Sequence, residues 1–122
     1  MISDNIAITA AHCACNTTDR TLYPGYSKGN APFGGARINQ VIIHPNYDPN
    51  VWGNEERIYK EDTHDWAILI LDRNIGNNTG WLGTRTYNGN NLGFVSYPVD
   101  KNYYGYPVQM YSPRKSDWMG FI

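Results

Sequence analysis

Short runs of β-branched and other apolar residues alternate with clusters of turn residues along most of this chain. Residues 37–43 and 65–71 form the clearest runs and predict two strands. The second run is almost continuously apolar, which predicts a strand buried on both faces, as in a closed barrel or a sandwich. Residues 6–9 predict the end of a further buried strand, and residues 91–97 and 106–111 predict two weaker ones. We therefore expect an all-β, antiparallel fold.

The segments between these runs carry residues that break or turn a chain. Residues 10–13 can form one helical turn, whereas residues 16–36 contain Pro-Gly and Gly-Gly pairs and predict a loop with at most one strand. Two prolines in residues 44–49 disfavour helix in the residues before them, so a turn is expected there. Residues 50–64 are polar and predict a loop, and residues 74–80 predict a linker.

Composition narrows the class of protein. The 122 residues are 41% hydrophobic and 17% charged, which excludes a disordered tail and predicts at most one domain with a modest core. The formal net charge is −1 and the basic residues are scattered, so no nucleic acid partner is expected. The longest apolar run, residues 66–71, is too short to span a bilayer, so no membrane association is expected either.

The start of the chain and its cysteines bear on the cellular compartment. Residues 1–4 have neither a basic start nor an apolar stretch, so no signal peptide is visible. Either the protein is cytoplasmic or its true N-terminus is missing, and the motifs described below favour the second. Cys13 and Cys15 are separated by one residue, which makes a mutual disulfide geometrically awkward.

Two residues suited to nucleophilic acyl transfer stand at the ends of predicted strands. This chemistry needs an attacking hydroxyl, a base near neutral pKa that takes its proton, and a carboxylate that holds the base in one tautomer. His12 follows the strand at residues 6–9, and its small neighbours allow a substrate to approach. Asp65 heads the most apolar strand, where a carboxylate is poorly solvated and needs a hydrogen-bonded partner. His12 and Asp65 are therefore the candidate base and orienting carboxylate.

The sequences around these two residues resemble the motifs of a known family. The segment "ITAAHC", which contains His12, resembles the histidine motif of the chymotrypsin-like (trypsin-like) serine peptidases. The segment "DWAILIL", which begins at Asp65, resembles their aspartate motif, and "VIIHPNYD" between the two resembles the strand and turn often found there. The order His then Asp is also the family's. The resemblance implies that His12 is the general base and acid, and that Asp65 orients His12 and stabilises its charged form.

The later sequence is similar to the bacterial glutamyl endopeptidase branch of this family. The similarity lies in "TGWLG" at residues 79–83 and "LGFVSYPVDK" at residues 92–101, although Ser96 stands where the branch has glycine. The resemblance implies a truncated two-barrel fold. Residues 1–75 would form a partial N-terminal β-barrel, and residues 76–122 would form a linker and the opening strands of the second barrel.

The resemblance also implies a nucleophilic serine, which the family holds in a Gly-x-Ser-Gly turn whose amides build the oxyanion hole. The serines of this chain all lie in other contexts: Ser3, Ser27, Ser96, Ser112 and Ser116. We therefore expect a fragment of a secreted serine endopeptidase that is inactive alone and whose parent cleaves peptide or protein substrates. Neither a cofactor nor a metal is implied.

Alternatives for the titratable residues remain open. His12 could be a core histidine bound to a backbone carbonyl, and Asp65 could bind a loop amide. His64 could compete as the partner of Asp65, although neighbouring side chains of a strand point to opposite faces. His44 is expected to be a solvated turn residue.

Two further alternatives concern binding. Cys13 and Cys15 could join His12 as zinc ligands, although the common structural zinc spacings differ. In the family, Cys13 pairs with a cysteine on an earlier strand that this chain lacks, so Cys13 is expected to be unpaired and Cys15 to be an ordinary loop residue. The chain could also be a non-catalytic relative that keeps the scaffold as a binding or regulatory module.

Overall fold

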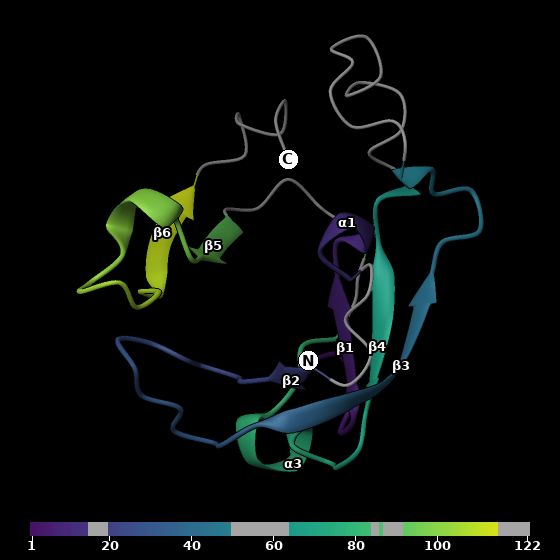
Figure 1. Ribbon diagram of the computed structural model, residues 1–122, viewed down its shortest axis with the longest axis horizontal. Coiled ribbons are helices and arrows are strands. Elements are labelled where there is room, and N and C mark those ends of the chain that lie inside the picture. The colour runs from purple at the N-terminus through teal and green to yellow at the C-terminus, as the bar shows by residue number, and fades with distance from the viewer. Residues whose placement is uncertain (15–19, 50–63, 84–85, 87–91, 115–122) are drawn as a thin grey trace, which may run out of the picture. The chain divides into compact units, whose positions relative to one another are not determined.

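The computed structural model contains two compact units. The described residues are 1–14, 20–49, 64–83, 86 and 92–114 (Figure 1). The first unit comprises Met1–Leu22 and Gly35–Gly83, and the second comprises Tyr23–Gly34 and Thr84–Ile122. The division at residue 75 into two barrels stays a prediction.

The first unit is built on a four-stranded antiparallel sheet with the strand order β1-β4-β3-β2. Its strands are β1 (Ile6–Thr9), β2 (Thr21–Leu22), β3 (Ala36–Ile43) and β4 (Ala67–Leu71). The pairing of β3 with β4 shifts register between Ile38 and Gln40, an irregularity of the kind that bends a strand. Figure 1 shows β3 curving along its length, so that the sheet curls. The predicted all-β, antiparallel architecture is confirmed.

A small apolar core packs against this sheet. It consists of Ala7, Ala11, Ala14, Ala36, Ile38, Ala67, Leu69, Leu71 and Ile75. Most of these are alanines, whose small side chains let α1 (Ala11–Ala14) pack closely on β3 and β4. This helix is the single turn predicted at residues 10–13. It buries Ala11 and Ala14 and leaves His12 exposed between them.

One face of β4 is buried, so the prediction of burial on both faces is wrong. Burial alternates along the strand from Ala67 to Leu71, and Ile68 is only half-buried. Ile68 pairs with Ile8 on β1 and with Ile42 on β3, whose side chains are 56% and 42% exposed. The second face of the sheet is therefore only partly covered by the residues that the structure describes.

Residues 74–80 pack against the rest of the first unit. They contain α3 (Gly76–Thr79), and Ile75 just before it is 1% exposed. The backbone N–H of Gly76 donates to the carbonyl oxygen of Asp4 at 2.6 Å, and a Cβ at Gly76 would lie 2.5 Å from the carbonyl oxygen of Ser3. Only glycine fits this close approach, which fixes the segment against the N-terminal residues.

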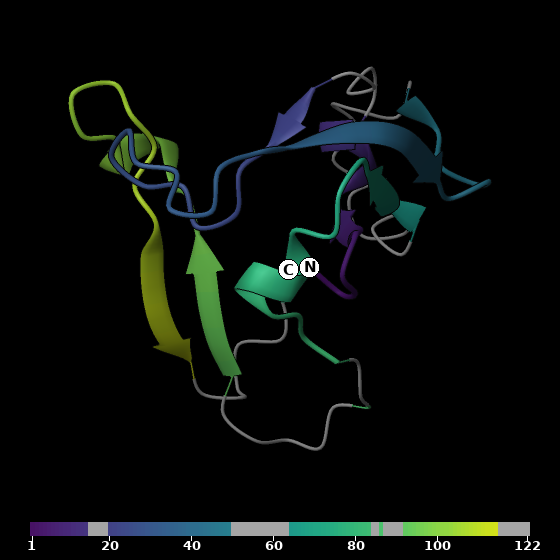
Figure 2. The same cartoon turned by 90° about the horizontal axis from the view of Figure 1, so that it is seen from below.

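The second unit contains a two-stranded sheet and a short 3₁₀ helix. Its elements are β5 (Leu92–Ser96), η3 (Val99–Lys101) and β6 (Met110–Arg114). Strands β5 and β6 run side by side in opposite directions, with Leu92 opposite Arg114 and Ser96 opposite Met110 (Figure 2). The strand predicted at residues 91–97 is confirmed.

The second strand of this sheet begins later than the strand predicted at residues 106–111. A tight turn ends at Tyr106, and in it Tyr103 and Tyr106 each donate a backbone N–H to the other's carbonyl oxygen at 2.9 Å. Tyr104 and Gly105 have φ angles of 46° and 82°, the left-handed pair that such a two-residue turn requires. Regular pairing with β5 starts only at Met110, opposite Ser96 where β5 ends, and the carbonyl oxygen of Pro107 instead accepts the backbone N–H of Lys28 at 3.0 Å.

Candidate active site

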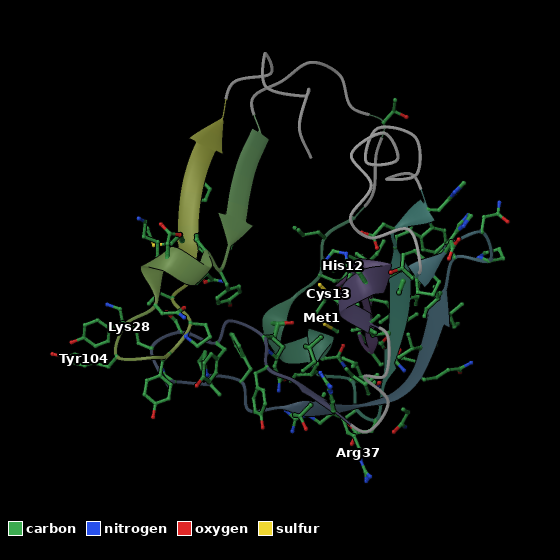
Figure 3. The ribbon with its side chains drawn as sticks, turned by 45° about the horizontal axis from the view of Figure 1, so that its top comes forward. Met1, His12, Cys13, Lys28, Arg37 and Tyr104 are labelled. Carbon is green, nitrogen blue, oxygen red and sulfur yellow. The ribbon has the colours of Figure 1, made fainter. Side chains whose placement is uncertain are left out.

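The pairing of β1 with β4 brings His12 and Asp65 to the same end of the sheet. The strands are antiparallel and Thr9 pairs with Ala67, so the end of β1 lies beside the start of β4. His12 follows Thr9 in α1, and Asp65 shortly precedes Ala67. Figure 3 shows His12 on this helix. Two motifs 53 positions apart in the sequence therefore converge in the first unit.

Two hydrogen bonds join His12 to Asp65. The backbone N–H of His12 donates to Oδ1 of Asp65 at 2.9 Å, and Nδ1 of the His12 ring lies 2.7 Å from Oδ2. An ionised carboxylate can only accept, so Nδ1 carries the proton of this bond. The neutral ring then holds its lone pair on Nε2, which is the tautomer that a general base needs.

The same contacts keep Asp65 ionised. Burial raises the pKa of Asp65, but hydrogen bonds from the backbone N–H and the ring of His12 outweigh it. The positive charge of protonated His12 and the backbone N–H of Ala11 lower the pKa of Asp65 further, so the net pKa lies below its ordinary value of 3.8. Asp65 therefore carries its charge at neutral pH.

The side chain of His12 is more exposed to solvent than that of Asp65. The side chain of His12 is 37% exposed and that of Asp65 is 24% exposed. The imidazole can therefore meet a reacting group from outside, while the carboxylate behind it is more shielded from water. This arrangement lets the ring exchange protons while its orientation stays fixed.

The lowered pKa of Asp65 predicts a specific loss of stability in acid. The folded chain holds this carboxyl group ionised to lower pH than the unfolded chain, so its contribution to the free energy of unfolding is complete above the ordinary pKa of 3.8. That contribution is lost as the pH falls through the lower, folded-state pKa. We expect the difference in unfolding free energy between wild type and Asp65→Asn to shrink below about pH 4. Urea melts at pH 6, 4.5 and 3 measure it, and a constant difference would contradict the expectation.

The other two histidines form a ring cluster with Trp66. The rings of His44 and His64 stack with centroids 4.5 Å apart and planes 15° apart. The ring of Trp66 meets His44 edge-on, with centroids 5.0 Å apart. His44 begins the predicted turn, since its carbonyl oxygen accepts the backbone N–H of Tyr47 at 3.0 Å, but its side chain is half-buried and not solvated as predicted. No local pattern indicates this cluster, because it depends on the end of β3 lying beside the start of β4.

Within the described residues, Cys13 and the potential metal ligands form no second site. Cys13 lies beside His12 on α1, is exposed, and forms no disulfide within the described residues (Figure 3). Cys15, the other ligand of the zinc alternative, lies outside the described residues. The described part of the chain contains no group of three potential metal ligands. Among these residues there is also no helix with the length and apolar character of a membrane span.

Two of the described serines take part in hydrogen bonds. The hydroxyl of Ser3 donates to Oδ1 of Asp4 at 2.7 Å, and Oγ of Ser27 lies 3.4 Å from the backbone nitrogen of Gln109. Two more serines lie within β5 and β6. Ser116 lies outside the described residues.

Comparisons with known proteins agree with this geometry. The family model described as Trypsin matches residues 1–97. Among solved structures, the chain is similar to a Glu endopeptidase in complex with MPD, with 25% sequence identity and a TM-score of 0.70. The match covers 94% of this chain and 54% of that one, so this chain spans about half the length of the Glu endopeptidase. A search of curated proteins found no significant match. The predicted chymotrypsin-like fold and the resemblance to glutamyl endopeptidases are confirmed.

Proposed function

Because the chain belongs to the trypsin family of serine peptidases, we propose that His12 and Asp65 are the base and the orienting carboxylate of a peptide-bond hydrolase. The observation that carries this proposal is the double contact between them. Asp65 accepts from both the backbone and the ring of His12, at 2.9 and 2.7 Å. A carboxylate held in this way sets both the position of the imidazole and its tautomer.

In the proposed reaction, a serine hydroxyl attacks the carbonyl carbon of a peptide bond while Nε2 of His12 accepts the hydroxyl proton. Asp65 stabilises the resulting imidazolium through Nδ1. His12 then gives the proton to the leaving amine, and it later activates the water that cleaves the acyl-enzyme. The serine belongs, in this proposal, to a Gly-x-Ser-Gly segment of the full-length protein, by which we mean this chain together with the sequence encoded next to it.

Two comparisons support the proposal. The family supports a protein substrate. The chain spans only about half of the Glu endopeptidase chain, which leaves room for a serine-bearing segment elsewhere in the full-length protein. We propose that this full-length protein is a secreted endopeptidase that needs no cofactor.

Covalent labelling with a fluorophosphonate probe tests the proposal, because the probe reacts with a serine that a neighbouring base activates. We expect stoichiometric labelling of the full-length protein, loss of labelling in its His12→Ala variant, and no labelling of residues 1–122 alone. Asp72→Asn is a control, since Asp72 accepts a hydrogen bond from the backbone of Arg37. Labelling of the 122-residue chain would show that it contains the nucleophile. If no Gly-x-Ser-Gly sequence is encoded nearby in any frame, the proposed hydrolase function is wrong.

A further inference from the structure

Two members of the ring cluster of His44, His64 and Trp66 flank Asp65 in the sequence. His64 and Trp66 are the two chain neighbours of Asp65, and both of their rings contact the ring of His44. His44 directly follows β3, so it comes from a different strand. One side chain from the end of β3 therefore contacts the residues on both sides of the candidate carboxylate.

Backbone hydrogen bonds tie the same three residues together. The N–H of Trp66 donates to the carbonyl oxygen of His64 at 2.9 Å, which makes a three-residue turn centred on Asp65. The N–H of His44 donates to the carbonyl oxygen of Trp66 at 3.2 Å and anchors this turn to the end of β3. The turn gives Asp65 its direction as the chain enters β4.

The ring of His44 is itself held in one orientation. The backbone N–H of Asn46 donates to Nδ1 of His44 at 3.1 Å, so Nδ1 acts as an acceptor. A ring that is fixed on its own turn offers a rigid surface to His64. The stack is nearly parallel, at 15°, and the contact with Trp66 is close to perpendicular, at 68°. Both are favoured arrangements for ring pairs.

The ring cluster is distinct from the hydrophobic core of the first unit. None of its three residues belongs to the buried core or to the apolar side chains packed against that core. Its contacts are concentrated on the turn that carries Asp65. The ring contacts therefore bear on this turn and not on the packing of the core.

We propose that His44 is a positioning residue whose ring holds the turn at Asp65, so that the carboxylate stays aimed at His12. This inference rests on the proposed function, because it assigns His44 to the same catalytic pair. His44 acts through His64 and Trp66, and substrate is not required for its effect.

Proton NMR of the 15N-labelled chain tests the inference without needing a nucleophile. The signal is the Nδ1 proton of His12, which the short bond to Asp65 shifts downfield and protects from exchange with water. We expect His44→Ala to broaden this signal or to speed its exchange about tenfold, since two ring contacts are lost. We expect His44→Phe, which keeps a ring against His64 and Trp66, to retain most of the protection.

Val41→Ala is the matched structural control. Val41 is half-buried on β3 and packs against the core, so its truncation should lower stability and leave the His12 signal unchanged. In the full-length protein, His44→Ala should lower kcat about tenfold and leave KM within about twofold.

The possible results distinguish failure of the positioning role of His44 from failure of the proposed catalytic pair. If the wild-type chain lacks a protected His12 proton, the proposed catalytic pair fails. If that proton is present but His44→Ala leaves it unchanged, or if Val41→Ala alters it equally, the positioning role is wrong. Unfolding of both His44 variants would also overturn it, because His44 would then be a general structural residue.

Discussion

Asp65→Asn is expected to lower the kcat of the full-length protein by about 10⁴-fold and to leave KM within about twofold. In the wild type, Oδ2 of Asp65 accepts the Nδ1 proton of His12 at 2.7 Å. An asparagine amide placed there would donate instead, so Nδ1 would have to accept and the ring proton would move to Nε2. That nitrogen could then no longer take the proton of the proposed serine nucleophile. Steady-state kinetics on a peptide substrate measure the effect.

Asp65→Asn should leave the positions of the two side chains unchanged. A loss of kcat would therefore report the altered tautomer of His12 and not a displaced ring. The amide oxygen of the introduced asparagine can still accept the backbone N–H of His12, the bond that spans 2.9 Å in the wild type. Asp72→Asn is the control, because Oδ1 of Asp72 also accepts a backbone N–H, from Arg37, at 2.9 Å. Its kcat should stay within about twofold of wild type. A loss of less than tenfold in Asp65→Asn would show that Asp65 does not orient the base.

The convergence of His12 and Asp65 was predictable because it depends on local sequence and on chain order. His12 shortly follows one apolar strand and Asp65 shortly precedes another, and antiparallel pairing of those strands suffices to bring the two residues together. The helical turn after β1 was predictable for a similar reason. The small residues of Ala11–Ala14 allow the helix to pack on the sheet.

Features that depend on exact register were not predictable. The contact of His44 with Trp66 needs the end of β3 to lie beside the start of β4, with Ile43 opposite Ala67, and neither strand encodes that pairing alone. The half-exposure of Ile68 has the same origin. An apolar run cannot show which of its faces a neighbouring layer will cover.

The late start of β6 shows that an apolar pattern alone does not locate the first residue of a strand. The segment at residues 106–111 contains enough aromatic and apolar residues to predict a strand. Tyr104, however, takes a left-handed φ of 46°, which is unusual for an aromatic residue and which a single-residue propensity does not anticipate. The reciprocal bonds between Tyr103 and Tyr106 hold the chain in that turn.

Ile75→Ala is expected to lower the free energy of unfolding of the chain by about 2–5 kcal/mol. Ile75 is the largest fully buried side chain among the described residues, at 1% exposed. Its truncation removes apolar contacts and leaves a cavity, whose cost depends on how far the surroundings can collapse. Collapse is restricted here, because Gly76 already lies against the backbone of Ser3 and Asp4. The loss should therefore fall in the upper half of that range.

Urea unfolding measures this loss, and Ile8→Ala is its matched control. Ile8 is the same residue type in the same unit, but its side chain is 56% exposed, so its truncation should cost less than about 1 kcal/mol. The slope of free energy against urea should stay the same in both variants, since neither changes the surface exposed on unfolding by much. Equal losses at the two positions would contradict the packing of residues 74–80 on the first unit. A larger loss at Ile75 would show that this segment is part of the structure that supports β1, and with it the helix that carries His12.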